Sequence, residues 1–539
     1  MKRTAKLISV YLALLLVTAA LAGVLSACNR DGKNADEFVI GTSAGIEHAD
    51  RSDYDFDQLS AGLTQQALVA RNTDGTYSPL LAEYAVSEDG RDYTFTVREG
   101  MCWDDGEPVD AADILFTLEY ADAHDSGGWL SSVTDTAGET TPSKLLSADV
   151  SEDGGSIVFR YREADVRALS DLTVLRIMPE HVYRGKTIET ATPAENRVGC
   201  GVYRFESYSA DAGTITFVPN EHYPYDGELA VKRVVVRLFA SDGTLQLAMK
   251  NGELDTIWKY SGGVEPSFAS MLAENGRANI IPVASDNLPA VLAFNTSASP
   301  FNDADLRKAV VYALDYSRFA SLFASEYAET PHAGFVPPTT LGYTPNTETL
   351  SRDLTRSRTH LEAGLARTGL SSLSFTLSVN ADNALHLSYA RQVKLQLEEA
   401  GISVTIKTMN QNDFRASTTN SGGNVSHQAC IIGYTANGMK MMGGLGTIYM
   451  DGGHAVQGVS QVFDATFDAI LDRLSAAATE EDYRAAAKEC QEWYAANFPA
   501  VALFWDAQLQ VLSPEWTGAH ADADFGLINM TTWLTLGRA

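Results

Sequence analysis

The sequence predicts an α/β protein of two or three domains, and three observations support this class. The chain has 539 residues, which is more than a single ordinary core accommodates. Hydrophobic residues make up 45% and charged residues 20%, as in globular proteins. Segments with strand and helix periodicity alternate, most clearly at residues 373–379, 383–400 and 402–408. Such alternation predicts sheets covered by helices.

The N-terminal segment has the pattern of a bacterial export signal. Basic residues among the first six precede an apolar run at 7–24, and Leu25-Ser26-Ala27 leads directly into Cys28. This pattern matches the lipobox, at which the cysteine thiol is lipidated and becomes the new N-terminus. The alternative is an uncleaved anchor, because the run is nearly long enough to span a bilayer. We expect residues 1–27 to be a lipoprotein signal peptide and 28–35 a tether, with lipid-bearing Cys28 holding the chain on the extracytoplasmic face of the cell membrane.

Charge and cysteine content restrict the function further. The net charge of -29 argues against nucleic acid as a partner, because nucleic-acid binding requires a basic surface. Outside the cytoplasm an even number of cysteines permits disulfides, and buried free thiols are the alternative. No cysteine or histidine spacing indicates a metal site, and no phosphate-binding or dinucleotide-binding glycine motif predicts a cofactor. The cysteines other than Cys28 are Cys102, Cys200, Cys430 and Cys490.

The first predicted strand, residues 37–41, is followed by a sequence that matches a catalytic motif. Gly41-Thr42-Ser43-Ala44-Gly45 matches the Gly-x-Ser-x-Gly pattern of serine hydrolases. That motif requires an earlier strand and a following helix, whereas residues 46–57 are polar and lack helical periodicity. An exported serine hydrolase using Ser43 is therefore only a remote alternative, and we expect no enzyme.

Further elements follow in order. Tyr93, Phe95 and Val97 alternate with polar residues and predict a half-buried strand, after which Asp110 is placed to cap a helix. The acidic residues at 53–57 lack the glycine that a calcium loop requires, so a solvated loop is expected there. Additional strands are predicted at 232–239 and 501–505, and helices at 243–251, 462–474 and 480–497.

An ordered series of motifs resembles the family 5 extracytoplasmic solute-binding proteins, the peptide- and nickel-type receptors of ABC importers. The resemblance extends along nearly the whole chain after the signal, and the order of the motifs makes it specific. The motifs include Leu80-Leu81-Ala82-Glu83, Ser87-Glu88-Asp89-Gly90 and Trp103-Asp104-Asp105-Gly106, followed by residues 177–183, 198–205 and 306–315.

The resemblance implies a two-lobed periplasmic-binding-protein-like fold of type II, cluster C, with an extra domain inserted in the first lobe. The motifs map the first lobe to residues 36–55, 167–265 and 500–539. They map the inserted domain to 56–166 and the second lobe to 266–499.

The resemblance also implies a ligand cleft with aromatic walls and a few polar groups. In peptide-binding relatives an aspartate pairs with the α-ammonium group of the peptide after a Gly-Trp-x-x pattern, where this chain has Tyr434 and Asn437. An asparagine accepts a hydrogen bond but cannot neutralise an ammonium group, so this position departs from the peptide pattern. The other candidate ligand contacts are Trp258, Tyr260, Asn295 and Trp129.

The function implied is capture of a solute between two closing lobes and its delivery to a permease. The expected solute is an oligopeptide or a peptide-like molecule, and a nickel chelate or another non-peptide solute is the alternative. The expected partners are the permease and ATPase subunits of an ABC importer, and the receptor itself is expected to be a monomer.

Overall fold

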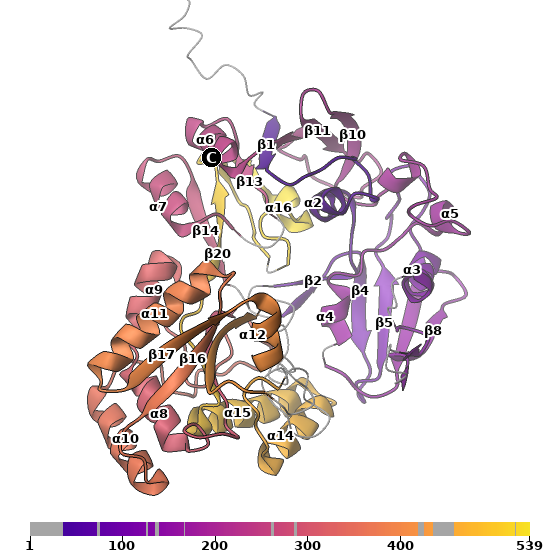
Figure 1. The fold of residues 1–539 in the computed structure, drawn as a ribbon. Helices are drawn as coiled ribbons and strands as arrows, with labels where there is room; N and C mark the ends of the chain where they lie inside the picture. Colours follow the sequence, from indigo (N-terminus) through magenta and orange to yellow (C-terminus); the bar gives the residue numbers. More distant parts are fainter. Residues whose placement is uncertain are drawn as a thin grey trace, which may run out of the picture.

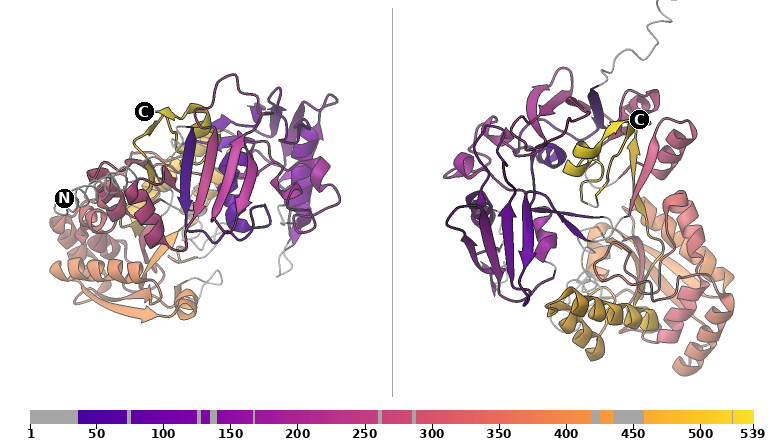
Figure 2. Two further views of the ribbon diagram at one scale, coloured as in Figure 1. Left: turned by 90° about the horizontal axis from the view of Figure 1, so that it is seen from above. Right: turned by 180° about the vertical axis from the view of Figure 1, so that it is seen from behind.

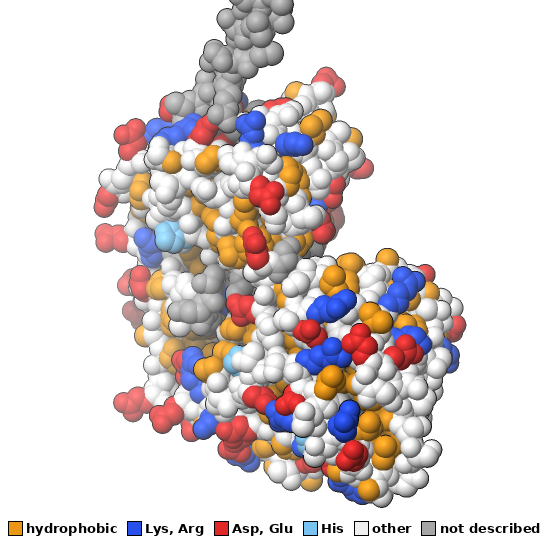
Figure 3. Space-filling view, turned by 90° about the vertical axis from the view of Figure 1, so that its left-hand side faces the viewer, with side chains coloured by type: hydrophobic (Ala, Val, Ile, Leu, Met, Phe, Trp, Pro, Cys, Tyr) orange, Lys and Arg blue, Asp and Glu red, His pale blue; other side chains and the backbone are white. Residues whose placement is uncertain are grey.

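The computed structural model describes residues 36–72, 76–124, 128–134, 140–166, 168–259, 263–284, 288–418, 425–434, 458–522 and 524–539. Figure 1 shows two α/β lobes, one above the other, and a smaller body rich in strands at their side. We call these the first lobe (upper), the second lobe (lower) and the side module (residues 68–177, with its own core). In Figure 3 the surface is indented between the two lobes, and acidic and basic side chains are interspersed over this face.

The first lobe is built on a five-stranded sheet with the order β10-β11-β12-β1-β13. β1 (Glu37–Thr42) pairs in parallel with β12 (Arg233–Leu238) and β13 (Thr256–Ile257), as expected of a strand that is buried on both faces from Phe38 onwards. Figure 2 shows β1 beside the strands of residues 203–238. The remaining elements are β10 (Tyr203–Ser209), β11 (Thr214–Pro219), α2 (Tyr54–Thr64), α6 (Asp242–Asn251), α7 (Pro266–Glu274), η1 (Glu195–Arg197), α16 (Met530–Thr535), β21 (Trp516–Thr517) and β22 (Gly537–Arg538).

Helix α2 lies where the sequence predicts a loop. Asp53 caps it by accepting a hydrogen bond from the backbone N–H of Phe56, so the expectation of a solvated acidic loop at 53–57 is corrected. Several residues that α2 buries are small or polar, among them Ser60, Ala61 and Gly62. A buried face made of such residues produces a weak apolar period, and this explains why the helix was missed.

The side module has a four-stranded antiparallel sheet with the order β4-β5-β9-β8. The predicted alternation at 93–97 appears as β5 (Asp92–Val97), in which Tyr93 and Phe95 are buried. The predicted cap is also present, because Oδ1 of Asp110 accepts a hydrogen bond from the backbone N–H of Ala112 at the start of α3 (Ala111–His124). The other elements of this part are β2 (Val69–Arg71), β3 (Tyr77–Pro79), β4 (Ala82–Val86), β6 (Val133–Thr134), β7 (Thr140–Thr141), β8 (Leu145–Val150), β9 (Ser156–Tyr161) and α4 (Ala168–Leu172), and α5 (Glu180–Tyr183) follows the module in the chain.

The second lobe has a mixed five-stranded sheet with the order β17-β16-β18-β15-β19. The helices predicted at 383–400, 462–474 and 480–497 appear as α11 (Ala384–Glu399), α14 (Ala465–Ser475) and α15 (Glu480–Asn497). The other elements are β15 (Leu288–Phe294), β16 (Ser374–Asn380), β17 (Ser403–Met409), β18 (Ala429–Tyr434), β19 (Ala500–Ala502), α8 (Ala304–Ala313), α9 (Tyr316–Phe323), η2 (Ser325–Tyr327), α10 (Leu354–Thr368) and α12 (Gln411–Thr418).

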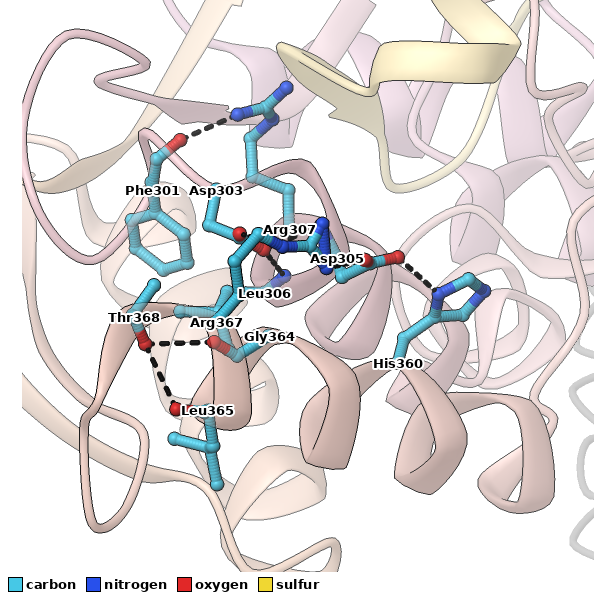
Figure 4. Close-up of polar contacts among 10 residues, drawn as sticks. All are labelled: Phe301, Asp303, Asp305, Leu306, Arg307, His360, Gly364, Leu365, Arg367 and Thr368. Atoms are coloured by element: carbon cyan, nitrogen blue, oxygen red, sulfur yellow. Dashed lines mark hydrogen bonds and ion pairs between the residues drawn. The ribbon is translucent and has the colours of Figure 1, made fainter.

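Ionic contacts join α8 and α10 on the outer side of the second lobe (Figure 4). Nδ1 of His360 lies 2.7 Å from an oxygen of Asp305, and Arg367 pairs with Asp305 and Asp303. Arg307 donates to the carbonyl oxygens of Phe301 and Asn497. The partners of these charged groups belong to the chain itself, so this region holds helices together.

Two antiparallel strands, β14 (Asn279–Ala284) and β20 (Ala507–Leu512), pass between the lobes. The predicted lobe boundaries lie before α7 and at residue 500. In the structure, the strands that pass between the lobes come later in the chain: β14 follows α7, and β20 begins at Ala507. Helix α7 packs against β1, α6 and β20 in one hydrophobic core, and this core belongs to the first lobe. The apolar residues of α7 therefore pack on the lobe opposite to the predicted one.

The side module touches the second lobe at a point remote from the crossing strands. Val166 packs against a core cluster of the second lobe, which includes Leu474 and Ala477. A Cβ atom on Gly90 would lie 2.4 Å from the carbonyl oxygen of Ala478, so only glycine fits at this contact. We call the contact of Gly90 and Val166 with residues 474–478 the rim contact.

The thiols of Cys102, Cys200, Cys430 and Cys490 are free. Burial raises the pKa of the Cys200 and Cys490 thiols to about 12. Thiols with such values are poor nucleophiles, so these two side chains serve as small core residues. In the part of the chain that the structure describes, none of the helices is long and apolar enough to cross a membrane.

Candidate functional site

Strand β20 directs alternate side chains to opposite sides of the crossing. Leu509 and Val511 enter the core that contains α6 and α7, whereas Leu512 belongs to the core around Phe38. Because side chains alternate along a strand, Gln508 and Gln510 lie on the face of Leu512. Gln510 is only 8% exposed, and within the described part of the chain neither glutamine side chain makes a hydrogen bond. The crossing therefore presents two carboxamides with unused hydrogen-bonding groups.

Trp258 and Lys259 lie next to these glutamines, just after β13. The hydroxyl of Thr256 donates to the carbonyl oxygen of Val511 (2.7 Å) and ties β13 to β20. The backbone N–H of Trp258 donates to the carbonyl oxygen of Gly41 at the end of β1 (2.9 Å). Trp258 is thus held between the central strand of the first lobe and the crossing strand.

These side chains line a pocket of about 50 Å³, which we call the glutamine pocket. Gln58 reaches it from α2, and the loop at 524–526 closes one side. Gly526 lets the loop approach, because a Cβ atom there would lie 2.8 Å from Nε2 of Gln510. The lining residues are Gln58, Trp258, Lys259, Gln508, Gln510, Asp524, Phe525 and Gly526.

The charges at the glutamine pocket are paired within the protein. Nζ of Lys259 lies 2.8 Å from a carboxylate oxygen of Asp242. Asp524 lies 3.9 Å from Arg71 of β2, and both side chains are at most 5% exposed. This buried pair holds the β2–β3 hairpin against the C-terminal loop, and it leaves the pocket close to neutral.

A second pocket, of about 30 Å³, adjoins the first because Asp524 and Phe525 line both. Arg176 lines it and is paired with Asp57 of α2 at 2.8 Å. Asp522 also lines it, and burial raises the pKa of this carboxyl to about 7, although its Oδ1 accepts a hydrogen bond from the N–H of Asp524. A carboxyl with this pKa titrates close to neutral pH.

Three predicted site residues, Cys28, Tyr260 and Asn437, lie outside the described residues. The backbone of Tyr434 ends β18 and pairs with Leu288, directly after the crossing from β14. The last residue of β18 therefore lies at the end of the second-lobe sheet that is near the crossing.

Asn295 lies at the other end of the same strand pair, because Phe294 pairs with Ala429, the first residue of β18. Its Nδ2 donates to the carbonyl oxygen of His427 (2.9 Å), and its Oδ1 accepts from the N–H and hydroxyl groups of Ser297. Asn295 is 3% exposed, so its polar groups bond to the chain itself. The structure does not bring Asn295 together with Tyr434 or Trp258.

Trp129 lies in the core of the side module. It is 4% exposed, and Nζ of Lys144 lies 4.2 Å from the centre of its ring. Its backbone N–H donates to Asp122 at 2.7 Å. These contacts place Trp129 among core residues and away from the glutamine pocket.

The Gly-x-Ser-x-Gly motif follows β1, but Ser43 is hydrogen-bonded to a carboxylate instead of a histidine. Its hydroxyl donates to Oδ1 of Asp242, the same carboxylate that pairs with Lys259. Among the described residues, no group of three or more His, Cys, Asp or Glu side chains is arranged to hold a metal ion.

Sequence reasoning missed Gln58, Gln508 and Gln510. The available signal was the alternation in Ala507–Leu512, where Gln508 and Gln510 alternate with apolar residues. Gln58 gave no signal, because it comes from α2, which was itself missed.

Comparison of the sequence with known proteins identifies the family to which the chain is similar. The model of the bacterial extracellular solute-binding proteins, family 5 (Middle), matches residues 76–453. The chain is 24% identical over 386 residues to the oligopeptide-binding protein OppA of Bacillus subtilis, covering 66% of this chain and 68% of OppA. It is also 24% identical over 362 residues to the nickel-binding periplasmic protein of Escherichia coli, covering 65% and 66%.

Solved structures share the fold. The structure of HbpA2 from Haemophilus parasuis matches with a TM-score of 0.76 at 18% identity, covering 93% of this chain and all of that one (100%). The predicted two-lobed binding-protein fold is thereby confirmed.

Proposed function

Since this chain belongs to the bacterial extracellular solute-binding proteins of family 5, we propose that it is the solute receptor of an ABC importer. In this role the two lobes close around a solute and present it to a permease that an ATPase drives. The observation that carries the proposal is the pair of crossing strands β14 and β20, which joins two lobes with separate cores. Such a crossing permits the lobes to rotate while their cores stay packed.

We propose that the solute is an oligopeptide or a peptide-like molecule. The similarity to a protein named for oligopeptide binding supports this class, and so do the unused carboxamides of the glutamine pocket, which match the donors and acceptors of peptide amides. The proposed ligand contacts are Trp258 and Tyr260 from the first lobe and Tyr434 and Asn437 from the second. A nickel chelate is the alternative, because another relative is named for nickel binding.

We also propose that Cys28 carries the lipid anchor. One acyl chain binds membranes weakly and reversibly, whereas two or more hold a protein stably, so a diacylated cysteine would keep the receptor beside its permease. The replacement Cys28→Ser should move the protein from the membrane fraction to the soluble extracytoplasmic fraction. Retention of the Cys28→Ser protein in the membrane would contradict the anchor.

The function is tested by a thermal shift screen on the chain from residue 28 onwards, carrying Cys28→Ser. A ligand at 100 times its Kd stabilises the folded state by about 2.7 kcal/mol, which raises the Tm of a large chain by a few degrees. We expect such a rise with one or more members of a library of di- to pentapeptides. A rise with nickel–histidine complexes only would select the alternative, and a blank with all solutes would contradict the receptor function.

The remote hydrolase alternative has its own test. An active serine would react with a fluorophosphonate probe, and Ser43→Ala would abolish the labelling. We expect no labelling of either protein, because the Ser43 hydroxyl donates to Asp242 and is not activated by a base of higher pKa.

A further inference from the structure

We propose that the glutamine pocket is a subsite for an uncharged group of the solute that both donates and accepts hydrogen bonds, as an amide or a pair of hydroxyls does. This inference rests on the proposed receptor function and adds the chemistry of one part of its site.

The first argument is hydrogen bonding. Gln510 is more than nine-tenths buried as a residue, and its carboxamide has no hydrogen-bond partner among the residues that the structure describes. Neither amide atom of Gln510 is fully buried, so both can bond to water in the pocket, and a solute group that replaces this water must offer the same donors and acceptors. Gln58 and Gln508 line the same space, and their carboxamides also have no partner in the described part of the chain. Each carboxamide offers both donors and acceptors.

The second argument is charge. The ammonium group of Lys259 is already paired with Asp242, and Asp524 with Arg71. Among the described residues that line this pocket, an anionic ligand group would meet no unpaired cation, and a cationic group would meet no unpaired carboxylate. Burying such a charge without a counter-charge is costly, and a neutral polar group avoids that cost.

The third argument is shape. The pocket of about 50 Å³ holds one small group and not a whole solute. Trp258, which is 8% exposed, provides an apolar wall beside the carboxamides. An apolar wall with a few convergent polar groups is the usual composition of a ligand site.

The position of the pocket gives the subsite a consequence for closure. Gln508 and Gln510 belong to β20, one of the two strands that join the lobes. A solute group bound there contacts a strand that joins the two lobes. It therefore stabilises the relative orientation of the lobes in which the glutamines lie closest to it.

The test follows the indole N–H signal of Trp258 in two-dimensional NMR of the chain from residue 28 onwards with Cys28→Ser, assigned by its loss in Trp258→Phe. The neutral probes are N-acetylglycinamide for the amide class and glucose for the hydroxyl class. The charged probes are acetate and ethylammonium, and each probe is titrated to 100 mM. We expect a saturable shift with at least one neutral probe, and the probe that binds more tightly identifies the class.

Variants separate the pocket from the rest of the surface. Gln510→Leu should weaken binding of the neutral probe at least tenfold, and Gln508→Leu serves if Gln510→Leu fails to fold. The matched control Gln246→Leu, on α6 outside the pocket, should leave binding unchanged. Equal shifts with acetate or ethylammonium, no shift with either neutral probe, or undiminished binding by both pocket variants would each overturn the subsite. A positive thermal shift screen alongside such a result would leave the receptor function standing.

Discussion

Two polar regions at strand ends differ in how they use their hydrogen-bonding groups. Around Asn295, the side chains of Asn295 and Thr296 bond to Ser297 and to backbone carbonyls of the second lobe. In the glutamine pocket, the carboxamides of Gln58, Gln508 and Gln510 have no hydrogen-bond partner among the described residues. Both regions contain buried amides, and only one of them has binding capacity left.

This difference teaches that a buried amide near a strand end is not in itself a ligand contact. Asn295 fits the sequence pattern of a site residue, yet it fastens the 295–297 turn to the start of β18. The glutamines fit no such pattern, yet their unused groups point to an external partner. The two regions should therefore respond oppositely to loss of the amide.

The largest expected effect is at Asn295. Asn295→Leu leaves the carbonyl oxygen of His427 and the N–H of Ser297 without their partner, so we expect a loss of about 3 kcal/mol in the free energy of unfolding. Urea unfolding should show a lower midpoint with an unchanged slope. Gln510→Leu is the matched comparison, and its free energy of unfolding should stay within about 0.5 kcal/mol of wild type, because it removes a water-accessible amide that has no partner among the described residues. Similar losses in both variants would break the comparison.

Much of the secondary structure is predictable from the sequence, because the pattern of apolar residues within a segment indicates whether that segment forms a helix or a strand. The helix predicted at 383–400 begins at Ala384, where Asn383 caps it by accepting a hydrogen bond from the N–H of His386. The apolar strand β1 and the alternating strand β5 also appear as predicted. The pattern of α7, in contrast, shows that Phe268 and Leu272 are buried but not on which lobe they pack.

The glutamine pocket is not predictable by the same means. Its members come from α2, β20 and the segment after β13, which lie far apart in the sequence and meet only in the folded chain. Trp258 was predicted from its position before the expected crossing. Gln510 required knowledge that its carboxamide lines a pocket and has no partner among the described residues, and this is a property of the packed molecule.

The second prediction concerns Asp522, beside the glutamine pocket. Burial raises the pKa of this carboxyl from 3.8 to about 7, so between these pH values the folded state holds a proton that the unfolded state has released. Stability therefore falls as pH rises through this window. Asp522→Asn keeps an oxygen for the N–H of Asp524, and it should gain about 1–2 kcal/mol at pH 8 and little at pH 4.

Urea unfolding at pH 4, 6 and 8 measures this effect. Asp211→Asn, at an exposed turn, should retain the wild-type pH dependence and serves as control. If Asp522→Asn is equally stabilising at every pH, the gain does not come from this ionisation.

The smallest effect on stability is expected at the rim contact. Variants at this contact test whether the environment of the glutamine pocket changes when the lobes separate. Gly90→Ala places a Cβ atom 2.4 Å from the carbonyl oxygen of Ala478, in a backbone conformation with φ of +68°. Gly185→Ala is the matched control, because φ is +76° there and nothing lies within 4 Å of the added atom. Both variants should lose about 1 kcal/mol from backbone strain alone. Only Gly90→Ala should separate the lobes, seen as a larger radius of gyration in X-ray scattering, and shift the Trp258 indole signal. If the scattering of both variants equals that of wild type, the rim contact is not a determinant of closure.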